Sequence, residues 1–320
     1  MSVLIDQRSR FIIQGVTGNV GRFSARDMRE YGTAVVGGVS AASPGMEIEG
    51  FPVFPDVRAA CAATRADASV IYVPATTALD HVVEAVEGGI KIVVYPGDGL
   101  PVRDAIEMRA AARANGATLI GPNTPGLISP GKAKAGFMPS FCYAPGALGV
   151  ISRSGSLSYE ACFRLTSAGL GQTTVIGIGG DPIKGVSAAE ALELLHADTE
   201  TQAIVYLGEI GGGDEYDVAT YAARRDAKPV AALIVGRQAP KGKKMGHAAA
   251  LIGSHADTHS AKMKALATAG VHAVGAVSEL VPAVAAALNV LKPSQESSGT
   301  FTPFDKAQDR PRLRGRSSRA

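Results

Sequence analysis

The sequence of 320 residues has no tryptophan, 5% aromatic residues in all and only three cysteines. Cys61, Cys142 and Cys162 are far apart and odd in number, which argues against a disulfide framework or a cysteine metal site and predicts reduced thiols. No apolar run is long enough for a membrane span, and the opening "MSVLIDQRSRF" lacks the apolar region of a signal peptide. We therefore expect a cytoplasmic protein without membrane contact.

Most of the sequence also lacks a net excess of charge of either sign. The net charge of +3 is carried by residues 293–320, and the preceding residues have equal numbers of basic and acidic side chains. A neutral body gives no electrostatic reason to expect nucleic acid as a ligand. The segment 293–320 is rich in Ser, Pro and Arg without apolar periodicity, which predicts a disordered basic tail.

Aliphatic runs alternate with amphipathic helical patterns, a sequence order typical of an α/β fold with parallel sheets. We predict a Rossmann-like domain over 1–125, a Pro/Gly-rich connector over 126–146 and a flavodoxin-like α/β domain over 147–292. The expected strands are 10–15, 33–39, 68–74, 91–96 and 117–122 in the first domain, and 147–155, 173–181, 202–212, 228–236 and 271–277 in the second.

A glycine-rich turn, "GVTGNVG" (15–21), follows the first expected strand and opens a helix. Such spacing lets a phosphate approach backbone amides at a helix N-terminus. A NAD site would place an acidic residue at the end of the second strand, but "VVGGVSAAS" offers none before Glu47. A nucleotide-like ligand without the dinucleotide hallmark and a purely structural glycine turn both fit this segment.

A second candidate anion site is "ISRSGSLSYEA" (151–161), where a strand passes into a helix. Ser154, Gly155 and Ser156 would present free N–H groups at the positive end of the helix dipole. Ordinary N-capping by serine explains the same residues equally well.

His247 differs from the other five histidines because it lies in a cationic, glycine-rich stretch, "APKGKKMGHAAALIG" (239–253). A neutral, oriented imidazole is a competent nucleophile toward phosphoryl groups. Glu209, in "GEIGGG", ends an expected strand and could accept a proton from one imidazole nitrogen, which would fix the tautomer. An exposed acid in a glycine loop is the alternative for Glu209.

Taken together, the chain resembles the α subunit family of succinyl-CoA synthetase, the succinate–CoA ligases, over residues 1–290. Six segments carry the resemblance in the family's order: "GVTGNVG", "IGPNTPG", "SRSGSLSYEA", "GIGGDPI", "GEIGGG" and "APKGKKMGHAAALI". Any one of them is weak, whereas six in order are specific.

The resemblance implies that the first domain binds CoA as a substrate and that the second carries a phosphorylated histidine, His247, with Glu209 as its partner. It implies an ATP-grasp β subunit, in a heterodimer or heterotetramer, that holds Mg²⁺ and the nucleoside triphosphate (NTP). The reaction would join a small carboxylic acid to CoA through an acyl phosphate. The matched positions are Thr17, Gly18, Asn19, Val20, Pro96, Gly97 and Asp98 for CoA, and Tyr159 and Thr124 for the substrate region.

Three departures from the family fall in the CoA and substrate region. Ser43 stands where the family has a lysine for the CoA phosphates, Thr124 replaces a cysteine, and Gly97 and Asp98 replace a hydroxyl–acid pair. We predict that Arg22 supplies the missing cation, because a guanidinium pairs well with phosphate. The departures leave the phosphoryl chemistry better supported than succinate as the acid.

Alternatives remain at this point. The acid could be malate or another dicarboxylate, or the chain could be a CoA-binding sensor without turnover. The presence of both His247 and Glu209 argues against a sensor, and the second strand argues against a NAD-dependent dehydrogenase.

Overall fold

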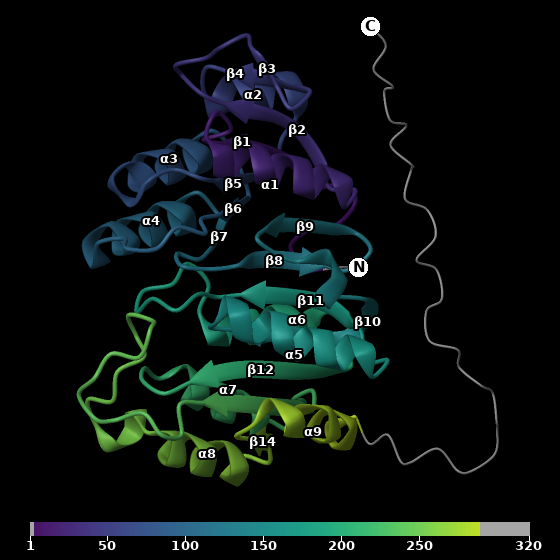
Figure 1. Cartoon of the computed structure of the whole chain (residues 1–320), viewed down its shortest axis with the longest axis vertical. Helices are drawn as coiled ribbons and strands as arrows, with labels where there is room; N and C mark the ends of the chain where they lie inside the picture. Colours follow the sequence, from purple (N-terminus) through teal and green to yellow (C-terminus); the bar gives the residue numbers. More distant parts are fainter. Residues whose placement is uncertain (1–2, 289–320) are drawn as a thin grey trace, which may run out of the picture.

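The computed structural model describes residues 3–288, which form two α/β domains stacked along the long axis of the molecule (Figure 1). The predicted tail, 293–320, lies outside the described residues. None of the helices between residues 3 and 288 has the length and apolar run that a membrane crossing needs.

The first domain is built on a sheet with the order β3-β4-β2-β1-β5-β6-β7. All neighbouring pairs are parallel except β3 with β4. Without β3, this is the 3-2-1-4-5-6 order of a Rossmann fold. Its elements are β1 (Arg10–Gln14), α1 (Asn19–Glu30), β2 (Ala34–Val39), β3 (Glu47–Ile48), β4 (Phe51–Phe54), α2 (Val57–Thr64), β5 (Ala68–Ile71), α3 (Ala75–Glu87), β6 (Ile92–Val94), α4 (Val102–Ala114) and β7 (Thr118–Ile120).

The second domain is built on a sheet with the order β14-β13-β12-β10-β11-β8-β9. Its five parallel strands follow the 2-1-3-4-5 order of flavodoxin-like folds. Its elements are β8 (Gly126–Ser129), β9 (Ala133–Gly136), η1 (Ser140–Cys142), β10 (Pro145–Ser152), α5 (Gly155–Ser167), β11 (Gln172–Gly177), α6 (Ala188–Ala197), β12 (Ala203–Glu209), α7 (Asp214–Ala222), β13 (Val230–Val235), η2 (His255–Asp257), α8 (His259–Thr268), β14 (His272–Val274), η3 (Val277–Glu279) and α9 (Leu280–Ala287).

The segment predicted as a connector, 126–146, contributes a hairpin to the second sheet. Its strands β8 and β9 pair antiparallel with each other, and β8 pairs antiparallel with β11. Gly126 has a φ of +106°, and a Cβ there would lie 1.9 Å from the carbonyl oxygen of Ala135. A glycine is therefore required where the two strands of the hairpin meet.

The central strands are apolar on both faces because helices cover both sides of each sheet. All seven residues of β12 are buried, as are all six of β11. This burial fixes the carboxyl ends of the central strands as rigid positions for functional groups.

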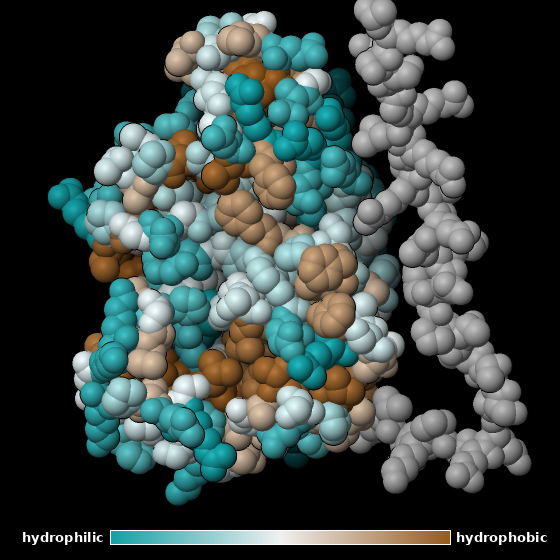
Figure 2. All heavy atoms as spheres, viewed as in Figure 1, coloured by the Kyte–Doolittle hydropathy of each residue, from teal (hydrophilic) through white to brown (hydrophobic). Residues whose placement is uncertain are grey.

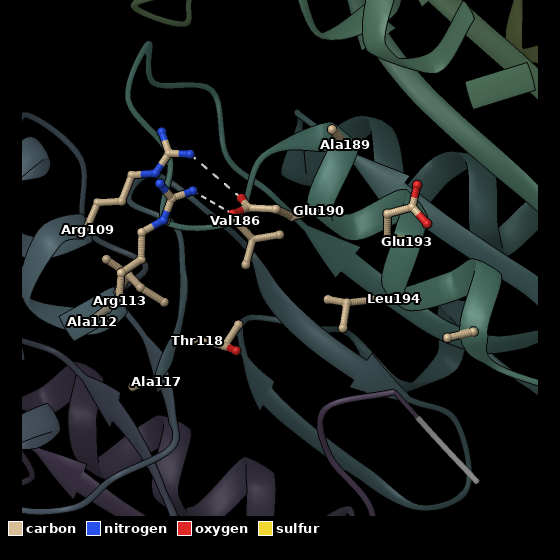
Figure 3. Close-up of a pocket in the computed structure, with 13 residues that line it drawn as sticks. Arg109, Ala112, Arg113, Ala117, Thr118, Val186, Ala189, Glu190, Glu193 and Leu194 are labelled. Carbon is tan, nitrogen blue, oxygen red and sulfur yellow. Dashed lines mark hydrogen bonds and ion pairs between the residues drawn. The ribbon is translucent and has the colours of Figure 1, made fainter. Parts of the chain in front are cut away.

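Ion pairs join the two domains at a seam between α4 and α6. The Arg113 guanidinium donates to Oε1 of Glu190 at 2.5 Å, and Arg109 lies 3.7 Å from Oε2 of the same carboxylate (Figure 3). Glu190 also caps its own helix, because Oε2 accepts from the backbone N–H and the hydroxyl of Ser187. Arg109, Arg113 and Glu190 line a pocket of about 520 Å³ between the domains.

Among residues 3–288, four phenylalanines are exposed, and large apolar side chains that gather on one face of a protein are unusual. They belong to α1, β9 with its following turn, η1 and α5, and Figure 2 shows apolar side chains over these elements. The exposed fractions are 54% for Phe23, 37% for Phe137, 75% for Phe141 and 46% for Phe163. We call these residues the aromatic face.

Candidate active site

The candidate catalytic residues meet at the carboxyl edge of the second sheet. Glu209 is the last residue of β12, Arg153 follows the neighbouring β10, and Asp181 follows β11. His247 comes from the long loop after β13. The carboxyl edge of a parallel sheet is where open α/β folds bind ligands.

The structure brings His247 and Glu209 together. Nδ1 of His247 lies 2.9 Å from each carboxylate oxygen of Glu209. The Glu209 side chain is 9% exposed and the imidazole 26% exposed, so the pair is shielded on the glutamate side and open on the histidine side. Because both contacts use Nδ1, a neutral imidazole carries its proton there and leaves the Nε2 lone pair for chemistry.

The charges around the imidazole act in opposite directions. The Glu209 hydrogen bond raises the pKa of His247 above its ordinary 6.5, burial opposes this, and the Glu209 charge adds to the increase. Arg153 lowers the pKa of His247, and Asp181 raises it. The net result is a raised pKa, set first by the Glu209 hydrogen bond and only partly opposed by burial and by Arg153.

Gly180 forms one wall of the histidine site. A Cβ at this position would lie 2.4 Å from Cγ of His247 and 2.8 Å from Nδ1. The Gly180 carbonyl also accepts a hydrogen bond from the Ala249 N–H, two residues after the histidine. The absence of a side chain at residue 180 therefore makes the space in which the imidazole lies.

Behind Glu209 is a buried ionic cluster that sequence analysis missed. We define the ionic cluster as Glu209, Asp214 and Glu215 with Arg153, Lys184 and Lys262, so acidic and basic groups are equal in number. Arg153, Glu215 and Lys262 have fully buried side chains. Buried charges are tolerated when they are paired, and every group of this cluster has at least one oppositely charged partner.

The start of α5 lies at the same sheet edge, because α5 follows β10, the strand next to β12. The Ser154 hydroxyl accepts from the Leu157 N–H at 3.4 Å, so this serine is an N-cap, as the alternative to an anion site expects. Gly155 and Ser156 begin the helix, and their N–H groups are among those that a helix leaves without an intrahelical partner. Capping and anion binding are compatible here.

The glycine loop of the first domain opens α1 as expected. Gly18 is the N-cap, and Thr17, Asn19 and Val20 are exposed at the helix start. A Cβ on Gly21 would lie 2.3 Å from the Gly15 carbonyl oxygen, so this glycine permits close strand–helix packing.

Two further CoA candidates lie close to this loop in the sequence. Arg22 is exposed, and its Nε donates to the Thr17 carbonyl at 3.2 Å. Ser43 is half-buried after β2, and its N–H donates to the Ser40 carbonyl at 3.2 Å. Their roles toward CoA stay predictions.

Asn123, another residue that sequence analysis missed, links the two regions. Its N–H donates to the Gly97 carbonyl at 2.7 Å, within the predicted CoA segment Pro96 to Asp98. Its side-chain amide donates to Asp181 at 2.9 Å, next to the histidine site. One residue therefore connects the CoA segment of the first domain to the carboxyl edge of the second.

The two predicted substrate residues differ in accessibility. Thr124 is 4% exposed, and its hydroxyl donates to the Gly177 carbonyl and accepts from the Gly126 N–H. Tyr159 is half-buried, and its hydroxyl donates to the Phe137 carbonyl. Both side chains already hold protein partners, and their role toward a substrate stays a prediction. Within residues 3–288, no group of three or more His, Cys, Asp or Glu residues could hold a metal ion.

Two family models match the chain, one in each domain. The model of the CoA binding domain matches residues 6–96, and the CoA-ligase model matches residues 151–272. The first match covers the glycine loop, and the second covers Arg153, Glu209 and His247.

Solved structures show the same fold at low sequence identity. ATP citrate lyase from Methanothrix soehngenii, in complex with citrate and coenzyme A, superposes with a TM-score of 0.82 at 22% identity. That match covers 95% of this chain and 54% of the lyase chain, so this chain spans about half of it. The dinucleotide-forming acetyl-coenzyme A synthetase 1 of Ca. Korarchaeum cryptofilum has a TM-score of 0.69 at 20% identity, over 86% of this chain and 59% of its own.

Curated relatives match nearly end to end. The ADP-forming succinate–CoA ligase subunit alpha of Aquifex aeolicus is 44% identical over 298 residues, which is 92% of this chain and 98% of the relative. The corresponding subunit alpha 2 of Archaeoglobus fulgidus is 47% identical over 270 residues, 84% of this chain and 94% of the relative. The chain therefore belongs to the α subunit family of the succinate–CoA ligases, which are CoA ligase enzymes.

Proposed function

We propose that this chain is the α subunit of an NDP-forming acid–CoA ligase that works through a phosphohistidine on His247. The reaction joins a carboxylate, CoA and NTP to give acyl-CoA, NDP and phosphate. The observation that carries the proposal is the His247–Glu209 pair, in which Nδ1 meets both carboxylate oxygens at 2.9 Å and Nε2 is left for phosphoryl transfer.

The chemistry divides into three balanced steps. Nε2 of His247 attacks the terminal phosphorus of NTP, and the bond to NDP breaks. A carboxylate oxygen of the substrate then attacks the phosphorus on His247, which forms an acyl phosphate and restores the imidazole. The CoA thiolate finally attacks the acyl carbon and releases phosphate. Each of the last two steps attacks the activated intermediate that the previous step supplies, first the phosphohistidine and then the acyl phosphate.

Two features of the sheet edge suit a phosphorylated histidine. The N–H groups at the start of α5 offer positive potential for the phosphate. Glu209 offers an anion to Nδ1, which stabilises the proton that this nitrogen keeps while Nε2 carries the phosphoryl group. Ordinary mobility of the loop around Gly246, whose φ is +82°, would let the phosphoryl group reach both substrates.

We expect Arg22→Ala to raise the apparent Michaelis constant for CoA about tenfold or more, because one exposed charge-assisted contact to a phosphate is lost. The constant for the carboxylic acid should stay within about twofold, since Arg22 lies at the glycine loop of the first domain. Steady-state kinetics of the complex with each substrate varied in turn measure both values. Arg26→Ala, one turn further along α1, is the matched control. Equal effects on the two substrates would refute the assignment.

The partner in this proposal is a β subunit of the ATP-grasp type that holds Mg²⁺ and the nucleotide. The relatives are named as alpha subunits, which implies a partner chain. The aromatic face supports this, because exposed aromatic side chains are enriched at the centres of protein interfaces. A chain seated there would contact α5, the helix that starts at the candidate active site.

The acid is tested by a substrate screen of the complex. We expect the chain, coexpressed with an ATP-grasp β partner, to copurify with it and to form acyl-CoA fastest with succinate, the acid in the names of its relatives. Faster turnover with malate would favour the second candidate, which the departures at Gly97 and Asp98 suggest. CoA binding without turnover of any acid would indicate a sensor and overturn the proposed function.

A further inference from the structure

Glu209 is held by its backbone as well as by its side chain. Its N–H donates to Oε1 of Glu215 at 3.2 Å, and its carbonyl accepts from Nη1 of Arg153 at 3.3 Å and from Nζ of Lys262 at 2.9 Å. Its carboxylate meets Nη2 of Arg153 at 3.3 Å. Arg153 is therefore the residue that contacts both the carbonyl and the carboxylate of Glu209.

Arg153 is itself immobilised. Its side chain is fully buried, with Nη1 2.8 Å from the Gly211 carbonyl and 3.1 Å from Oε1 of Glu215, and Nε 3.4 Å from Asp214. Glu215, also fully buried, accepts from the Tyr206 hydroxyl at 3.1 Å and pairs with Lys262. The hydrogen bonds at Nη1 and the Asp214 carboxylate beside Nε hold the planar guanidinium in place, so that Nη2 faces the Glu209 carboxylate in a fixed position.

We propose that Arg153 is a positioning residue for phosphoryl transfer, which holds the Glu209 carboxylate against Nδ1 of His247 so that Nε2 remains the nucleophile. The inference rests on the proposed function and goes beyond it, because Arg153 touches neither the substrate nor the imidazole. A carboxylate held only by the imidazole could rotate away and allow the other tautomer, whose Nε2 is protonated and inert.

The charge of Arg153 adds a second effect. The groups that face His247 are Glu209 from β12, Asp181 from the segment after β11 and Arg153 from the segment after β10. The two acids favour the imidazolium, and Arg153 opposes it. Loss of the arginine charge would therefore make the imidazole protonate at higher pH and shift the pH range of phosphorylation upward.

Two variants separate position from charge. Arg153→Lys keeps the charge and loses the planar guanidinium, whereas Arg153→Met with Asp214→Asn loses the charge of residue 153 and keeps the ionic cluster neutral. Histidine-selective ¹⁵N NMR of the full chain measures the tautomer of His247, and a spectrum of His247→Asn assigns its signal. Label transfer from NTP in the complex, followed against pH, measures the rate.

We expect a single tautomer protonated at Nδ1 in the wild type and a mixture in both variants. Phosphorylation should slow by on the order of 10- to 100-fold, as a small misplacement of a reacting group does. Only the double variant should move the midpoint of the pH profile upward. Lys184→Gln is the matched control, because Lys184 pairs with Asp214 at 2.9 Å and is not a partner of Glu209 in the ionic cluster. It should leave the tautomer unchanged.

Melting temperatures show which variants fold, and Glu215→Gln replaces Arg153→Lys if the latter does not. This isosteric change removes the anion beside Nη1 and should give the same mixed tautomers. A folded Arg153→Lys or Glu215→Gln chain with the wild-type tautomer and rate would overturn the proposal. An unlabelled His247 in the wild-type complex would defeat the proposed function instead, and the tautomer of the free chain would still test Arg153.

Discussion

Replacement of His247 by asparagine should abolish phosphoryl label on this chain and reduce turnover of the complex by roughly 10³-fold or more, as loss of a covalent nucleophile does. The asparagine amide can still meet Glu209 but has no lone pair suited to attack phosphorus. The complex incubated with labelled NTP should show acid-labile, base-stable label in the wild type alone. CoA binding should be unchanged, because the glycine loop lies in the other domain.

The pH dependence of this label follows from the raised pKa of His247. Protonation removes the Nε2 lone pair, so label formation should fall as pH decreases through a pKa above the ordinary 6.5. The effect on stability has the opposite sign. A histidine whose pKa is raised by folding stabilises the fold at pH values below the unfolded pKa, and this contribution is lost as pH rises through the folded pKa.

Label that survives in His247→Asn would contradict the assignment of His247 as the phosphorylated residue.

Gly180→Ala should nearly eliminate phosphorylation while the chain still folds. The new Cβ would lie 2.4 Å from Cγ of His247, so the ring must move and its contacts with Glu209 must lengthen. A displacement of about an ångström at a reacting group costs on the order of 100-fold in rate, and this clash demands at least that much. The rate of label transfer is the measurement.

Gly213→Ala is the matched control for this substitution. Gly213 lies in the adjacent glycine loop with a φ of −117°, and a Cβ there meets no atom within 4 Å. It should retain the wild-type rate within about twofold, the scale of a minor change at a helix N-cap. If His247 is phosphorylated as fast in Gly180→Ala as in this control, the absence of a side chain at residue 180 has no role in positioning the imidazole.

The sequence predicts the sheets well where strands are aliphatic and central. The two-residue β3 and the strand β4, with Pro52 inside it, were missed because proline lacks the ladder donor and is depleted in strands. The hairpin of β8 and β9 was missed because glycine and proline in this segment indicate a loop, whereas here the glycines allow two backbones to meet.

The residues of the candidate site likewise divide into those that the sequence predicts and those that only the structure reveals. His247 and Glu209 stand in short motifs whose chemistry is visible in the chain, and the structure places them in contact. Lys262 lies in a polar helix and resembles a surface lysine in sequence, yet its side chain is fully buried against Glu215. Arg153 lies in a Ser/Gly turn that gives no sign of its role, since its partners Glu209, Asp214 and Glu215 are distant in sequence. Such pairings depend on tertiary contact and leave no periodic signal.

The carboxylate of Glu190 couples the unfolding of the two domains. The same group caps the first turn of α6 and accepts from the arginines of α4, so the end of a helix in one domain and the seam with the other depend on one side chain. Separation of the domains would weaken that cap, and fraying of the helix would loosen the seam. We therefore expect the two domains to melt in one cooperative transition, although each has the architecture of an independent folding unit.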